Sequence, residues 1–238
     1  MTYEAHLGPY RGRDPRLATA SRGVVANPME HVESSKIPLA TIADFLADPG
    51  GYDPEESWAR AIADVVGGAA GADPDGDDVA ADVAAFATYA DNVRLSCLEP
   101  SDSPVLVRLL EDLAFVTAVD DAKGRSRVAA EVVATGRRLR DAVTRITRPG
   151  FANPGLAAEQ APWLRVAALG AEAMVAMGEV LGDPASDQDA IVAALAPHLT
   201  ILRDQRHRVF GDVLEMTLND LVSDPVPTGR NQLEEGTP

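Results

Sequence analysis

Asn27 is the residue of this chain whose type and position are best suited to binding chemistry. It follows the short apolar run of residues 24–26 (Val-Val-Ala) and precedes Pro28. The run predicts a β-strand that ends here, because proline has no N–H to donate to a ladder and disfavours helix at the residue before it. Residues 34–46 then predict a helix opened by two serines. An amide between a strand and a helix lies where α/β barrels place binding groups, although an Asn before Pro is also a common turn residue.

Asp120 and Asp121 are a second candidate for a catalytic pair, because they follow an apolar stretch that could be a strand. The apolar positions of residues 105–116, however, recur at the i, i+3, i+4, i+7 spacing of an amphipathic helix. That helix is predicted to begin with Ser103 as its N-cap and Pro104 in its first position. The aspartate pair then lies at a helix C-terminus, where the helix dipole disfavours anions. We therefore predict a solvated turn there instead of a catalytic site.

Glu30, His31 and Glu33 carry groups that can bind metals. Zinc sites usually need more well-placed ligands, and the sequence has no second cluster of His and Cys. We predict neither a metal nor another cofactor. The single cysteine, Cys97, excludes an intrachain disulfide and is expected to be a buried thiol. The sequence has no Gly-rich phosphate loop and no Gly-x-Ser-x-Gly elbow.

A set of short motifs lies between residues 7 and 62. They are Leu-Gly-Pro-Tyr at 7–10, Asn-Pro-Met-Glu at 27–30, Glu-Ser-Ser-Lys-Ile at 33–37, Tyr-Asp-Pro at 52–54 and Ser-Trp at 57–58. Together they resemble the last strand–helix unit of the barrel in family 84 of the glycoside hydrolases, the β-N-acetylglucosaminidases that include O-GlcNAcases and bacterial hyaluronidases. Residues 85–87 and 162–164 more weakly resemble the helical region that follows the barrel in that family.

The resemblance implies that Asn27 contacts hydroxyls of the sugar in the −1 site. It also implies catalysis by two consecutive aspartates on an earlier strand, of which one orients the substrate's own N-acetyl group and the other transfers protons, an exception to the usual two-carboxylate scheme. Only 26 residues precede Asn27, and Asp14 is the only aspartate among them. We therefore predict no catalytic residue in this chain, which is expected to be the C-terminal part of such an enzyme and inactive alone.

The predicted fold class is mainly α. Residues 1–52 are expected to form the terminal strand–loop–helix unit of a (β/α)8 barrel, residues 53–222 a helical bundle of the post-catalytic type, and residues 223–238 a disordered tail. Asp53 and Pro54 predict the first helix of the bundle as N-cap and first-turn proline. Aromatic residues make up only 5% of the chain, so Ala, Val and Leu are expected to fill the core.

The net charge of −16 argues against nonspecific binding to nucleic acid or to an anionic membrane. No apolar run approaches the length that crosses a bilayer. The arginine-rich residues 125–148 are either a docking surface for an acidic partner or a solvated face paired with acids of neighbouring helices, and we favour the second. The sequence does not indicate a compartment.

The expected partner is an N-acetylglucosaminide substrate, bound only together with the missing barrel, and a homodimer is one of the alternatives. Without barrel neighbours, residues 1–60 are expected to fold onto the bundle, to stay mobile, or to self-associate through exposed Ile37, Ile42 and Phe45. Two alternatives remain for the chain as a whole. It is a scaffold module that binds proteins without catalysis, or one half of a split glycosidase whose other chain supplies the aspartate pair.

Overall fold

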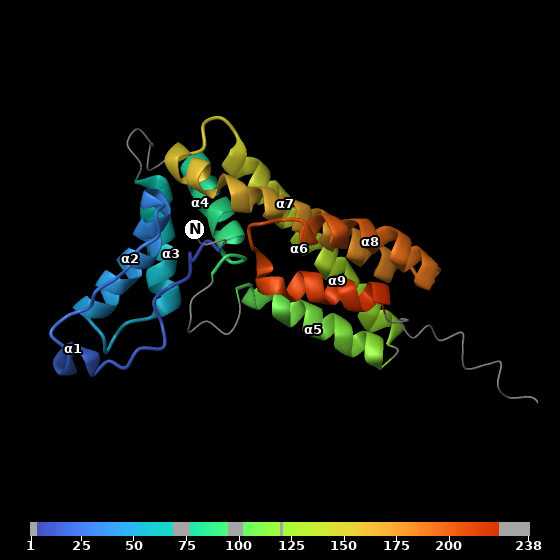
Figure 1. The fold of residues 1–238 in the computed structure, drawn as a ribbon, viewed down its shortest axis with the longest axis horizontal. Helices are drawn as coiled ribbons and strands as arrows, with labels where there is room; N and C mark the ends of the chain where they lie inside the picture. Colours follow the sequence, from blue (N-terminus) through green and yellow to red (C-terminus); the bar gives the residue numbers. More distant parts are fainter. Residues whose placement is uncertain (1–3, 69–76, 95–101, 120, 224–238) are drawn as a thin grey trace, which may run out of the picture. The chain divides into compact units, whose positions relative to one another are not determined.

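The structure is a computed structural model that describes residues 4–68, 77–94, 102–119 and 121–223. All its regular elements within these ranges are helices (Figure 1). They are α1 (Leu17–Ala20), α2 (Val32–Ala47), α3 (Pro54–Gly67), α4 (Asp77–Ala90), α5 (Pro104–Ala118), α6 (Ala122–Thr147), α7 (Pro154–Gly182), α8 (Gln188–Arg203), the 3-10 turn η1 (Phe210–Asp212) and α9 (Val213–Ser223). The predicted mainly helical fold is confirmed. Cys97, Asp120 and residues 224–238 of the predicted tail lie outside the described residues.

Contacts within the chain define two compact units. The first unit takes its described residues from 4–104, 141–167 and 206–211, and the second from 105–140, 168–205 and 212–223. Helices α6 and α7 contribute residues to both units. All the motifs between residues 7 and 62 belong to the first unit, together with the beginning of α7. The predicted boundary between residues 52 and 53 stays a prediction.

The predicted strand at residues 24–26 is wrong. Within the described ranges the chain forms no strand, and residues 23–29 have no regular secondary structure. Val24 is 38% exposed and Val25 is 99% exposed. A strand needs a neighbour to pair its backbone N–H and C=O groups, and no second strand is present in the described part of the chain to supply one.

Helix α2 begins at Val32, two residues before the predicted start, with His31 as its N-cap residue. The two serines therefore lie inside its first turn, where both are buried. Helix α3 begins as predicted. Its N-cap Asp53 accepts a hydrogen bond from the backbone N–H of Glu56 at 2.9 Å, and Pro54 takes the first helical position.

Residues 4–10 pack against α3 and the end of α4. Leu7 is fully buried; its N–H donates to the Val93 carbonyl at 3.0 Å, and its own carbonyl accepts from Trp58 Nε1 at 2.6 Å. A Cβ at Gly8 would lie 2.0 Å from the Arg94 carbonyl oxygen, so this position requires glycine. The Arg94 guanidinium lies 4.4 Å from the centroid of the Trp58 ring. The N-terminal residues thus fold onto the helices of the first unit.

The expected exposure of Ile37 and Phe45 is wrong. Ile37 is fully buried and Phe45 is 3% exposed, because α2 packs against α3 and against the residues that precede it (Figure 1). The Phe45 ring contacts Tyr10 and Tyr52 edge-on, at centroid distances of 5.2 and 5.5 Å. Ile37 and Phe45 of α2 are therefore buried by packing within the first unit.

Small residues allow α6 and α7 to approach closely in the second unit. A Cβ at Gly178 would lie 2.5 Å from the Ala129 carbonyl oxygen, and one at Gly136 would lie 2.8 Å from that of Ala171. This close packing agrees with the low aromatic content. Helices α8 and α9 also pack together, and Arg203 donates to Asn219 Oδ1 at 2.7 Å between them.

Three arginines of α6 and the turn after it, Arg137, Arg145 and Arg148, pair with acids on neighbouring helices, as the favoured interpretation predicted for the arginine-rich residues. In the first unit Asp82, which is 1% exposed, accepts from Arg145 Nε at 2.7 Å and from Arg148 Nη2 at 3.0 Å. The backbone N–H of Ala152 donates to the same carboxylate at 2.8 Å. Asp82 therefore joins α4 to the end of α6 and to the turn that follows.

The substitution Asp82→Ala is expected to lower the free energy of unfolding by about 1–3 kcal/mol, because it leaves two arginines and a backbone N–H without their buried acceptor. Asp78→Ala is the matched control on the same helix. Asp78 also pairs with Arg145, but its side chain is 85% exposed, so its loss is expected to cost less than about 1 kcal/mol. Urea denaturation measures both, and equal losses would contradict the assignment.

Candidate functional site

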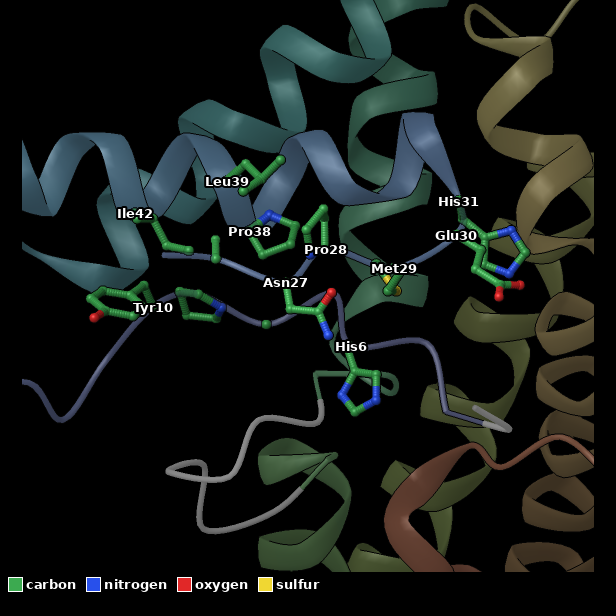
Figure 2. Close-up of a pocket in the computed structure, with 13 residues that line it drawn as sticks. His6, Tyr10, Asn27, Pro28, Met29, Glu30, His31, Pro38, Leu39 and Ile42 are labelled. Carbon is green, nitrogen blue, oxygen red and sulfur yellow. The ribbon is translucent and has the colours of Figure 1, made fainter. Parts of the chain in front are cut away.

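A pocket of about 620 Å³ lies in the first unit around Asn27 (Figure 2). Three stretches form it: residues 6–10, residues 26–31, and one side of α2. We call residues 26–30 the Asn27 segment. The side chains that line the pocket combine apolar and polar groups, and the labelled ones are His6, Tyr10, Asn27, Pro28, Met29, Glu30, His31, Pro38, Leu39 and Ile42.

Asn27 is exposed at this pocket, and its side-chain amide points toward the His6 ring in Figure 2. Among the described residues it has no hydrogen-bond partner, so its amide is available to a ligand. The sequence correctly places Asn27 in a loop before a helix, but no strand leads into that loop. Its role as a substrate contact stays a prediction.

The N-terminus of α2, which follows the Asn27 segment, is capped by a residue far along the chain. The carboxylate of Glu159 on α7 accepts from the backbone N–H of Glu33 at 3.0 Å and from that of Ser34 at 2.9 Å. It also accepts from the Ser34 hydroxyl at 2.9 Å. The first N–H groups of a helix have no partner within the helix, and the helix dipole favours an anion at that end. Glu159 supplies the acceptor that the N-cap residue His31 does not provide.

A buried chain of hydrogen bonds continues from this cap to α4. Gln160 Nε2 donates to the Ser34 hydroxyl at 2.8 Å, and the Tyr89 hydroxyl donates to Gln160 Oε1 at 2.7 Å. All three side chains are fully buried. Burial raises the pKa of Tyr89 well above its ordinary value, so its hydroxyl stays a neutral donor. The network fixes α2 against α4 and α7. Because its side chains are buried, water cannot replace their hydrogen-bond partners.

Asn153, directly before α7, adds a further connection. Its Nδ2 donates to the Glu33 carboxylate at 3.0 Å and to the Val65 carbonyl at 2.8 Å. Hydrogen bonds from Lys36 and then from Asn153 lower the pKa of Glu33. Sequence reasoning missed Asn153, Glu159 and Gln160. Their partners are more than 70 residues away in the chain, and the only local signal was a cluster of polar residues at the start of an otherwise apolar helix.

The ring of His31 does not cap α2 but packs against Trp163. The two rings meet edge-on with centroids 5.4 Å apart, and Trp163, which is 2% exposed, also contacts His207 at 4.9 Å. Burial, and then the positive charges of Arg206 and Arg165 and the nearby His31, lower the pKa of His207. The surroundings of His207 therefore favour its neutral form.

The three residues considered as metal ligands, Glu30, His31 and Glu33, do not form a metal site in the described structure. Glu33 pairs with Lys36 and Asn153, while Glu30 and His31 line the pocket. The described residues contain no group of three or more His, Cys, Asp or Glu side chains placed to hold a metal ion. None of the described helices is long and apolar enough to cross a membrane.

Asp121, the described member of the aspartate pair, is exposed and precedes α6. Its carboxylate accepts from the backbone N–H of Gly124 at 2.9 Å. This is the bond of a helix N-cap. Asp121 therefore begins α6, so the predicted position at a helix C-terminus is wrong for this residue: it lies at a helix N-terminus, where the helix dipole favours an anion.

Comparison with known proteins finds similarity to one family over the part of the chain that holds this site. The family model for beta-N-acetylglucosaminidase matches residues 2–87, a range that contains α2, α3 and the Asn27 segment. The structure is also similar to a mutant O-GlcNAc hydrolase from Thermobaculum terrenum, with 26% sequence identity and a TM-score of 0.69. The chain is therefore similar to the C-terminal region of the family 84 β-N-acetylglucosaminidases.

The similarity extends over nearly the whole chain. The alignment with the Thermobaculum terrenum O-GlcNAc hydrolase covers 92% of this chain and 45% of that protein. A second structure, CpGH84B, has 18% identity and a TM-score of 0.73, and the alignment covers 92% of this chain and 37% of that one. The second match supports the fold alone. The chain therefore spans less than half the length of either of these relatives.

The substitution Glu159→Ala is expected to lower the free energy of unfolding by about 1–2 kcal/mol, because it removes the cap of α2. Glu172→Ala is the matched control, since Glu172 lies on the same helix and is exposed; we expect a change within about 0.5 kcal/mol. Amide hydrogen exchange provides the local readout. Faster exchange in the first turn of α2 in the Glu159 variant alone supports the cap, and unchanged exchange there would contradict it.

Proposed function

We propose that this chain is the non-catalytic C-terminal part of a β-N-acetylglucosaminidase-like glycoside hydrolase. Its helices hold the Asn27 segment, and Asn27 contributes a contact to a sugar hydroxyl in the intact enzyme. The observation that carries the proposal is the match of residues 2–87 to the β-N-acetylglucosaminidase family. Asn27 lies inside that range and lines the pocket.

The chemistry of Asn27 suits this role. A side-chain amide offers both donors and an acceptor, and sugar hydroxyls need both. The pocket of about 620 Å³ lies within the usual size range of small-molecule sites. The amide has no competing hydrogen bond among the described residues, so a sugar hydroxyl would not have to displace a protein partner.

The proposal leaves proton transfer to other residues. Asp14, the only aspartate before Asn27, pairs at the surface with Arg16, whose hydrogen bonds lower the pKa of Asp14. Such a carboxylate is a poor proton donor. The aspartate pair that family 84 uses would come from a barrel outside this chain, and an N-acetylglucosaminide would bind only with that barrel present.

The remaining partners are proposed on the same basis. The net charge of −16 counts against nucleic acid and anionic membranes as partners. A homodimer stays a prediction, and light scattering of the purified chain measures it. Because Ile37 and Phe45 are buried, the exposed Val32, Leu39 and Leu46 are the large apolar residues that α2 offers for association.

The test is hydrolysis of a fluorogenic N-acetyl-β-glucosaminide. We expect no turnover from this chain alone, and turnover when a family 84 barrel is joined to it or added as a second chain. In the active form, Asn27→Ala is expected to lower kcat/KM about tenfold to a hundredfold, the effect of one lost or unsatisfied hydrogen bond.

Asn219→Ala, on α9 in the second unit, is the control and should leave kcat/KM unchanged. Turnover by this chain alone, after contaminating enzyme is excluded, would overturn the non-catalytic assignment. Wild-type kcat/KM in Asn27→Ala would overturn the sugar contact.

A further inference from the structure

We propose that Glu159 and Ser35 are positioning residues for Asn27: through the first turn of α2 they set where the Asn27 amide lies at the pocket. Their effect on sugar binding rests on the proposed function, whereas their effect on the order of the Asn27 segment does not. Neither residue lines the pocket. Each would therefore act on a ligand through the segment and not by direct contact.

One hydrogen bond holds the Asn27 segment. Within the described part of the chain, residues 22–30 take part in a single hydrogen bond, in which the Ser35 hydroxyl donates to the Met29 carbonyl at 3.2 Å. Residues 22–28 are exposed, so they bury little surface that could hold them. Pro28 separates Met29 from Asn27, and its ring fixes its φ angle. A displacement of the Met29 carbonyl is therefore passed on to Asn27.

Glu159 fixes the helical turn from which Ser35 reaches Met29. Ser35 is 4% exposed and lies in the first turn of α2. The two residues before it, Glu33 and Ser34, donate their backbone N–H groups to the Glu159 carboxylate at 3.0 and 2.9 Å. These N–H groups have no acceptor within the helix. Without Glu159 the first turn is expected to fray, which would move the Ser35 hydroxyl away from the Met29 carbonyl.

The cap is itself held by buried groups. Gln160, next to Glu159 on α7, donates to the Ser34 hydroxyl at 2.8 Å and accepts from the Tyr89 hydroxyl at 2.7 Å. Ser34, Gln160 and Tyr89 are fully buried. A buried network whose members are satisfied is rigid. The start of α2, and with it the position of Ser35, is therefore tied to the interior of the first unit.

A purely stabilising role of the cap is the alternative, and a second helix cap provides the comparison. Asp187 is the N-cap of α8 in the second unit, where its carboxylate accepts from the Ala190 N–H at 2.9 Å. Asp187→Ala is expected to lower the stability by a similar amount, without a change at the Asn27 segment. The edge-on contact of His31 with Trp163 is left in place by every variant below.

Backbone ¹⁵N relaxation of the full 238-residue chain tests the positioning without a sugar. In the wild type and in Asp187→Ala we expect order parameters near 0.85 for Met29 and Glu30, as in a rigid backbone. Glu159→Ala and Ser35→Ala should each lower them below about 0.6. Glu159→Gln keeps one acceptor oxygen and should give intermediate values.

A double-mutant cycle in the active form, with the barrel joined, tests the effect on sugar binding. Glu159→Ala should lower kcat/KM about threefold to tenfold, because a small misplacement of a contacting group weakens catalysis. The loss should divide between kcat and KM as it does in Asn27→Ala. Combined with Asn27→Ala, it should cost less than about twofold, since the amide that Glu159 positions is absent. Asp187→Ala should leave kcat/KM unchanged in both backgrounds.

A rigid segment in Glu159→Ala or in Ser35→Ala would overturn the role of that residue. Equal mobility in Asp187→Ala would show a general loss of stability and would overturn both roles. Fully additive losses in the cycle would overturn the action through Asn27. Wild-type kcat/KM in Asn27→Ala would instead overturn the sugar contact, and the order parameters would still decide the positioning.

Discussion

The beginning of α2 depends on a carboxylate that lies about 125 residues further along the chain. A helix N-terminus exposes backbone N–H groups that must find acceptors, and here the N-cap residue supplies none from its side chain. Glu159 of α7 accepts from two of these N–H groups and from the Ser34 hydroxyl. This single interaction fixes where α2 starts, and therefore where the Asn27 segment ends.

Further hydrogen bonds in the first unit hold the residues around this cap in place. Gln160 and Tyr89 extend the cap into the interior, and Asn153 holds Glu33 beside it. Residues 7–10 are held by the hydrogen bond from Trp58 to the Leu7 carbonyl and by the close packing of Gly8 against the Arg94 backbone. The motifs that resemble a glycosidase thus have largely structural roles in this chain. Asn27 and Glu30 are both exposed and make no hydrogen bond in the described structure, which for Asn27 fits the proposed role in binding.

The sequence predicted those features that depend on neighbouring residues. The starts of α3 and α5 follow from a proline in the first turn, and Asp53 caps α3 as predicted. Three misjudged features depend on distant residues. Residues 24–26 read as a strand, but the described residues offer no partner for it. Ser34 read as a helix start, but Glu159 moves the start to Val32. Ile37 and Phe45 were expected to be exposed, because their partners on other elements were not visible in the pattern.

The central claim is that this chain brings a sugar-binding amide, held by helices, to an active site whose acids lie elsewhere. The most direct measurement is a crystal structure of the chain joined to a family 84 barrel, with an N-acetylglucosamine-derived inhibitor bound. We predict that the Asn27 amide lies within hydrogen-bond distance, about 2.7–3.2 Å, of a hydroxyl of the inhibitor. A bound inhibitor out of reach of Asn27 would contradict the claim.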